Sequence, residues 1–172
     1  MTYDVVLLAE QALTLDDATR VKSLHEGLEG PVYHVLLPRE DAAARIEAAM
    51  GTLSAAEYVG PAVSINEMDL DEVRKESEKE SEAALAETLR VLTAAGATAH
   101  GELVDDPVAA LRTRVKDVDG REVIILTRPH VVSEFLHLDW THQARRHLQV
   151  PVLHLIEHEN FDEQAGEGEG IL

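Results

Sequence analysis

Four short runs of the sequence are apolar almost from end to end, and they constrain the fold more than any other feature. They read VVLLA, VYHVLL, VIILT and VLHLI, at residues 5–9, 32–37, 123–127 and 152–156. A strand with one solvent-exposed face alternates apolar and polar residues, whereas a strand buried on both faces is apolar throughout. We therefore expect a parallel sheet buried on both sides, with TAHGELV at residues 98–104 as a weaker fifth strand.

The segments between these runs have the period and the caps of helices. Thr14 and Asp17 have the spacing of a capping box, and Gly27 suits the end of the helix that they start. Asp106 followed by Pro107 predicts the start of another helix. In all, helices are predicted within residues 14–28, 42–59, 68–95, 107–115 and 131–148. The third is long enough that part of it should project past the sheet or the helix should be broken.

Strands that alternate with crossover helices predict an α/β fold with a doubly wound, right-handed, parallel sheet. In such a sheet a ligand binds beyond the carboxyl ends of the strands, where the winding direction reverses. With the first strand in the centre, this crevice lies between the first and fourth strands. The candidate ligand-binding residues in the loops that meet there are Glu10, Gln11, Thr127, Arg128 and His130.

Size and charge narrow the classes of protein that fit. The chain has 172 residues, which predicts one domain at residues 1–157, followed by an acidic, glycine-rich tail at 158–172 that is too polar to pack. Its 33 acidic and 15 basic residues give a formal charge of −18, which repels nucleic acids and anionic lipids. No apolar run approaches the ~18 residues of a membrane helix. We expect a cytoplasmic protein with neither nucleic acid nor membrane as a partner.

Several segments, taken in order, resemble the universal stress protein family. They are YDVVLLAE, VYHVLL, GELVDDPVAAL, REVIILTRPH and RRHLQVPVLHLIE, and the resemblance covers the chain apart from the tail. It implies a sheet of five strands in the order 3-2-1-4-5 and a role in stress adaptation. It also implies a homodimer through the last strand, with Val152, Leu153 and Leu155 at the interface.

The departures from the family concern its nucleotide site. In ATP-binding members an Asp ends the first strand, and a loop G-x-x-G-x9-G-(S/T) follows the fourth. Here Glu10 stands at the first position, and the second region reads TRPHVVSEFLHLDWTHQA, without a glycine. Pro129 lacks a backbone donor, and Val131 and Val132 restrict the backbone where a phosphate loop needs freedom. We expect the crevice to remain and conventional ATP binding to be lost, so no cofactor is expected.

Two interpretations of the crevice stay open. In the first, the protein is a non-catalytic regulator that acts through protein contacts, and Arg128 pairs with Glu10 or Glu134. In the second, Arg128 and His130 hold a nucleotide or small anion by charge-assisted hydrogen bonds at the start of the last helix. No Ser, Thr or Lys stands beside a His in a spacing typical of a nucleophile and its base, so no catalytic residue is predicted.

Nine histidines raise the question of a metal or a pH sensor. The run HLIEH at residues 154–158 matches the inverted zinc-protease pattern H-x-x-E-H. In a strand, however, its two histidines would stand ~13 Å apart, too far to share an ion. Two other groupings are His34 with His100, on neighbouring strands, and His137 with Asp139 and His142. Scattered histidines are more often ordinary hydrogen-bonding groups, and no metal site is predicted.

Overall fold

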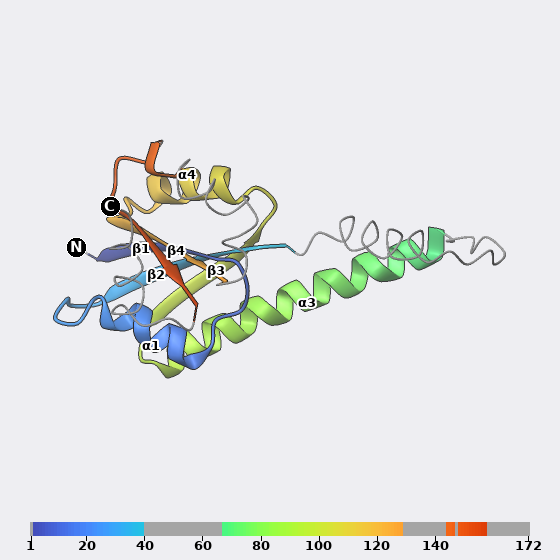
Figure 1. Cartoon of the computed structure of the whole chain (residues 1–172), viewed down its shortest axis with the longest axis horizontal. Helices are drawn as coiled ribbons and strands as arrows, with labels where there is room; N and C mark the ends of the chain where they lie inside the picture. The colour runs from blue at the N-terminus through green and yellow to red at the C-terminus, as the bar shows by residue number, and fades with distance from the viewer. Residues whose placement is uncertain (1, 40–66, 129–143, 147, 158–172) are drawn as a thin grey trace, which may run out of the picture.

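The computed structural model of the protein describes residues 2–39, 67–128, 144–146 and 148–157. Its strands form one 5-stranded sheet in the order β3-β2-β1-β4-β5 (Figure 1). Every neighbouring pair is parallel. The strands are β1 (Tyr3–Ala9), β2 (Pro31–Pro38), β3 (Thr98–Val104), β4 (Glu122–Thr127) and β5 (Val152–Ile156). The predicted fold class and strand order are confirmed.

Helices cover both faces of this sheet (Figure 1). They are α1 (Leu15–Ser23), α3 (Glu67–Ala94) and α4 (Pro107–Asp117). Residues of α1 and α3 share one hydrophobic cluster with one side of β1, β2 and β4. Leu111 of α4 and Ala144 share a second cluster with the opposite side of the same strands. The central strand is therefore buried on both faces, and Val5, Val6 and Leu7 are 0% exposed, as its continuous apolar run predicts.

The long helix α3 extends well past the sheet at its amino-terminal end (Figure 1). Its carboxyl-terminal half lies against β3, where Gly101 makes the close approach possible. A Cβ at Gly101 would come within 2.7 Å of the Leu85 side chain and 3.2 Å of Val35. A side chain at Gly101 would therefore require the Leu85 side chain to move and would make a tight contact with Val35.

The end of α1 corrects a prediction. The helix begins after Thr14, whose side chain forms the predicted capping box with Asp17. It ends at Ser23, however, and not near Gly27, because the chain then turns so that the side chain of His25 enters the structure. His25 is 5% exposed and lies between the Tyr33 hydroxyl and the Glu122 carboxylate. Gly27, with φ of 92°, belongs to the turn that leads into β2.

Several predictions fall on residues outside the described part of the chain. They concern the helix within residues 42–59, most of the helix within 131–148, the tail at 158–172, and the side chains of His130, His137, Asp139 and His142. Among the helices that the structure describes, none is long and apolar enough to cross a membrane.

Candidate functional site

The segments that follow β1, β4 and β5 meet at one edge of the sheet. The N–H of Glu10 donates to the carbonyl of Leu126 at 3.0 Å, and the N–H of Glu157 donates to the carbonyl of Thr127 at 2.8 Å. The strand pairing thus continues one residue past β1 and β5. This pairing brings the predicted residues Glu10, Thr127 and Arg128 together, and it adds Glu157, which the topological rule for the crevice did not single out.

Glu10 and Arg128 are bonded to each other across the crevice. The backbone N–H of Arg128 donates to Oε2 of Glu10 at 2.9 Å. The guanidinium Nε of Arg128 lies 4.0 Å from Oε1 of the same carboxylate, an ion pair just beyond hydrogen-bonding distance. One of the two pairings that the sequence suggested for Arg128, with Glu10, is therefore present.

Gln11 and Glu157 form the second contact between the loops. The side-chain amide of Gln11 donates to Oε2 of Glu157, which is 1% exposed. Burial raises the pKa of Glu157; the hydrogen bond from Gln11 offsets this in part, and the charge of Asp17 adds to it. Oε1 of Glu157 is buried and has no hydrogen-bond partner in the described part of the chain. The crevice thus contains a buried carboxyl group that is only half satisfied.

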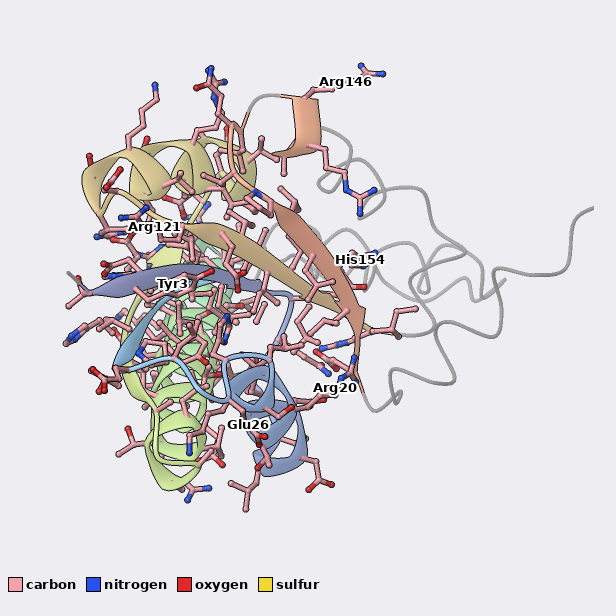
Figure 2. The ribbon with its side chains drawn as sticks, turned by 90° about the vertical axis from the view of Figure 1, so that its left-hand side faces the viewer. Tyr3, Arg20, Glu26, Arg121, Arg146 and His154 are labelled. Atoms are coloured by element: carbon pink, nitrogen blue, oxygen red, sulfur yellow. The ribbon has the colours of Figure 1, made fainter. Side chains whose placement is uncertain are left out.

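Arg20 reaches this region from α1. Figure 2 shows its side chain next to the carboxyl end of β5, and its Nη1 donates to the carbonyl of Ile156 at 2.8 Å. Arg20 carries no signal in the sequence, because only the packing of α1 against the end of β5 brings it here. Among the described residues around the crevice there are three carboxyl groups and two guanidinium groups, which belong to Glu10, Asp17 and Glu157, and to Arg20 and Arg128.

Thr127 and His154 form a pair that the sequence spacing did not indicate. The Thr127 hydroxyl lies 2.8 Å from Nε2 of His154, on the neighbouring strand. A hydroxyl and an imidazole at this distance have the geometry of a nucleophile and its base. Thr127 is 1% exposed, however, so its hydroxyl has no access to a substrate. The pair satisfies two polar groups within the sheet.

The zinc interpretation of residues 154–158 finds no support in the described residues. His154 bonds to Thr127, Glu157 lies in the crevice, and His158 lies outside the described part of the chain. Within residues 2–39, 67–128, 144–146 and 148–157, no group of three or more His, Asp or Glu side chains is arranged to hold a metal ion.

The residues predicted at a dimer interface differ in exposure. Leu155 is 1% exposed and packs into the core of its own chain, so it cannot lie on a surface. Leu153, two residues earlier on the edge strand β5, is 39% exposed. Val152 is half-buried against the opposite face of the sheet. Leu153 is the member of this set that remains available for contact with another chain.

Neither family models nor curated proteins match this sequence. Solved structures do. The hypothetical protein MJ0577 superposes with a TM-score of 0.53 at 12% identity, over 91% of this chain and 97% of that one. A universal stress protein family protein from Arabidopsis thaliana with AMP bound superposes with a TM-score of 0.51 at 13% identity, over 93% of this chain and 94% of that one. The universal stress protein from Archaeoglobus fulgidus superposes with a TM-score of 0.50 at 14% identity, over 90% of this chain and 94% of that one.

The chain is thus an α/β protein of the doubly wound parallel class, with a crevice at the ends of β1, β4 and β5. Within that class it has the fold of universal stress proteins, and the predicted resemblance is confirmed for the fold.

Proposed function

We propose that this protein is a non-catalytic, universal-stress-like regulator that acts through protein contacts and does not bind ATP in its crevice. The observation that carries the proposal is the hydrogen bond from the Arg128 backbone to Glu10. A phosphate loop works because backbone N–H groups after a strand are free to meet phosphate oxygens. Here the first such N–H group after β4, that of Arg128, already donates to the carboxylate of Glu10, which occupies the position that a phosphate oxygen would take.

The charge and solvation of the crevice support the same proposal. A phosphate that approached Arg128 would have to displace Glu10 and would still face its negative charge. Glu157, buried and close by, adds a second carboxyl group. Like charges brought together in a partly buried site repel strongly, because little water screens them. A triphosphate would therefore bind only at a large electrostatic cost.

A homodimer through β5 is part of this proposal. In the described residues β5 pairs only with β4, so the backbone groups along its other edge face outward. Such an edge invites pairing with another strand unless something covers it. Leu153 adds an exposed apolar side chain to that edge. A second copy of the chain would cover both the open backbone groups and this leucine.

A second candidate function, a small-anion-binding regulator, is favoured by one atom. Nε of Arg128 is buried and has no hydrogen-bond partner among the described residues. A small anion that accepted a hydrogen bond from this Nε–H group would supply the missing partner. In that case Arg128 and His130 would be the ligands, with Gln11 and Thr127 beside them.

Calorimetric titration with ATP and with AMP, each with and without magnesium, separates the two candidates. We expect no heat of binding at micromolar concentrations and no thermal stabilisation by either nucleotide. Micromolar binding that disappears in Arg128→Ala would overturn the main proposal and support the anion-binding regulator. Arg112→Ala is the matched control, since Arg112 is an exposed arginine on α4, away from the crevice.

A further inference from the structure

A row of polar side chains crosses three strands on the face of the sheet that α4 covers. It consists of Asp4 on β1, His34 on β2 and His100 on β3. His34 and His100 are register partners in the parallel pair β2–β3, so both imidazoles leave the sheet on the same side. Their ring centroids are 6.3 Å apart, with 39° between the ring planes.

Asp4 fixes the orientation of the first imidazole. Nε2 of His34 lies 2.8 Å from Oδ1 of Asp4, and both side chains are largely buried. The Asp4 carboxylate accepts the Nε2 hydrogen of His34, which leaves the Nδ1 lone pair of this ring available. Histidines that bind metals are commonly held by a carboxylate in this way.

A small cavity adjoins the two rings. Its volume is about 90 Å³, and it is lined by His34, Val35, His100, Gly101, Glu102 and Arg114. A water molecule occupies ~30 Å³ in the liquid, so the cavity has room for an ion with part of its hydration shell. Glu102 follows His100 by two residues and thus points to the same side of β3. Its carboxylate is paired with Arg114 at 2.6 Å.

We propose that His34 and His100 form a two-histidine site for a divalent transition-metal ion such as Zn²⁺. Water completes the coordination, and Glu102 can serve as a third ligand when it leaves Arg114. Two imidazoles on one tetrahedral ion have centroids ~5 Å apart, given Zn–N distances of about 2.0–2.1 Å. His100 must therefore approach by roughly 1 Å, which its exposed side chain can do by rotation.

The described residues contain no preformed set of three ligands, and Glu102, the third candidate, is paired with Arg114. The ion itself would draw the second histidine inward. A site with two firm protein ligands and one competed carboxylate binds more weakly than a closed structural zinc site, and we expect micromolar affinity.

The test is a Zn²⁺ titration of the full chain, followed by the NMR signals of the imidazole C–H groups. Since the chain has nine histidines, total zinc uptake is not a sufficient readout. We expect the signals of His34 and His100 to shift together and to saturate with the same midpoint. In His100→Ala the shift of His34 should be lost, whereas Thr98→Ala, an exposed change on the same strand, should keep both.

A gain of affinity provides a second, independent measurement. Arg114→Gln removes a positive charge from the cavity and releases Glu102. The zinc dissociation constant reported by His34 should then fall roughly three- to tenfold. The proposal is overturned if the His34 and His100 signals do not move at millimolar Zn²⁺. It is also overturned if His34 responds with the same midpoint in the wild type and in His100→Ala.

Discussion

Nδ1 of His25 lies 2.7 Å from the hydroxyl of Tyr33, at the end of the sheet opposite the crevice. The other ring nitrogen of His25 bonds to the Glu122 carboxylate, which also accepts a 3.3 Å hydrogen bond from Tyr3. The network joins the turn after α1 to β1, β2 and β4. It is therefore a place where one hydroxyl group has a measurable effect on stability.

Tyr33→Phe should destabilise the protein by about 1–3 kcal/mol, because it leaves one nitrogen of a buried imidazole without its partner. The free energy of unfolding from urea denaturation measures this loss. Tyr3→Phe is the matched control, because the Tyr3 hydroxyl makes a longer, partly exposed hydrogen bond to the Glu122 carboxylate of the same network. For this variant we expect the free energy of unfolding to fall by less than ~1 kcal/mol. Equal losses in the two variants would contradict the central position of the His25–Tyr33 bond.

Alkaline pH should weaken the fold through the same residue. Burial, and secondly the charge of Glu122, raise the pKa of Tyr33 from 10.0 to about 12. Between these values the unfolded chain has lost the phenolic proton and the folded chain still holds it. The stability from Tyr33 is complete below pH 10 and falls as the pH rises, by at most about 1.4 kcal/mol per pH unit.

Urea denaturation between pH 9 and 11.5 checks this dependence, with Tyr33→Phe as the reference that lacks the titrating group. The variant should show the shallower decline. Parallel curves for the two proteins would mean that other groups cause the alkaline loss.

Glu157→Gln should leave the protein as stable at pH 7, or stabilise it by about 1 kcal/mol, since an amide can replace the buried carboxylate beside Gln11. Because burial raises the pKa of Glu157 above its value in the unfolded chain, the wild type gains stability from this group as the pH falls through that window. The advantage of the variant should therefore shrink as the pH falls from 7 toward 4.5, the ordinary value for this carboxyl group. An advantage that grows toward acidic pH would show that Glu157 is stabilised in its charged form.

Leu153→Asp should increase the monomer fraction in sedimentation velocity, because a charge would be placed on the exposed edge of β5. Leu28→Asp is the control: Leu28 is 45% exposed, against 39% for Leu153, but lies in the turn before β2. A dimer that persists in Leu153→Asp would exclude β5 as the interface.

The fold was predictable because strands that are buried on both faces are uninterrupted apolar runs in the sequence. β1 and β4 are covered on both faces, and their buried stretches, residues 5–9 and 123–126, are apolar without interruption. The edge strand β3 was the weaker candidate for the same physical reason. His100 and Glu102 are exposed there, so the run is mixed, although its predicted bounds of 98–104 match the structure. The end of α1 was misplaced because Gly27 is a good helix terminator, whereas burial of His25 ends the helix earlier.

The crevice was predictable only where topology decides it. Residues directly after β1 and β4 must meet once those strands are neighbours, and Glu10 and Arg128 do. Arg20 arrives from a helix, and no periodicity in α1 specifies its contact with the carbonyl of Ile156. The bond between Thr127 and His154 joins residues that are 27 positions apart and depends on the register of β4 with β5. His34 and His100, by contrast, were grouped from the sequence as residues on neighbouring strands, and the register of β2 with β3 places them side by side.

The central place of β1 also sets the order in which the chain can fold during synthesis. β1 is made first, and β2 can pair with one of its edges soon afterwards. Its other edge waits for β4, since Val5 pairs with Glu122 far along the chain. Until the ribosome has released that strand, one edge of the most apolar segment of the protein stays open. Pairings this distant in sequence form slowly, so the nascent chain is most vulnerable to aggregation while α3 and β3 are still being made.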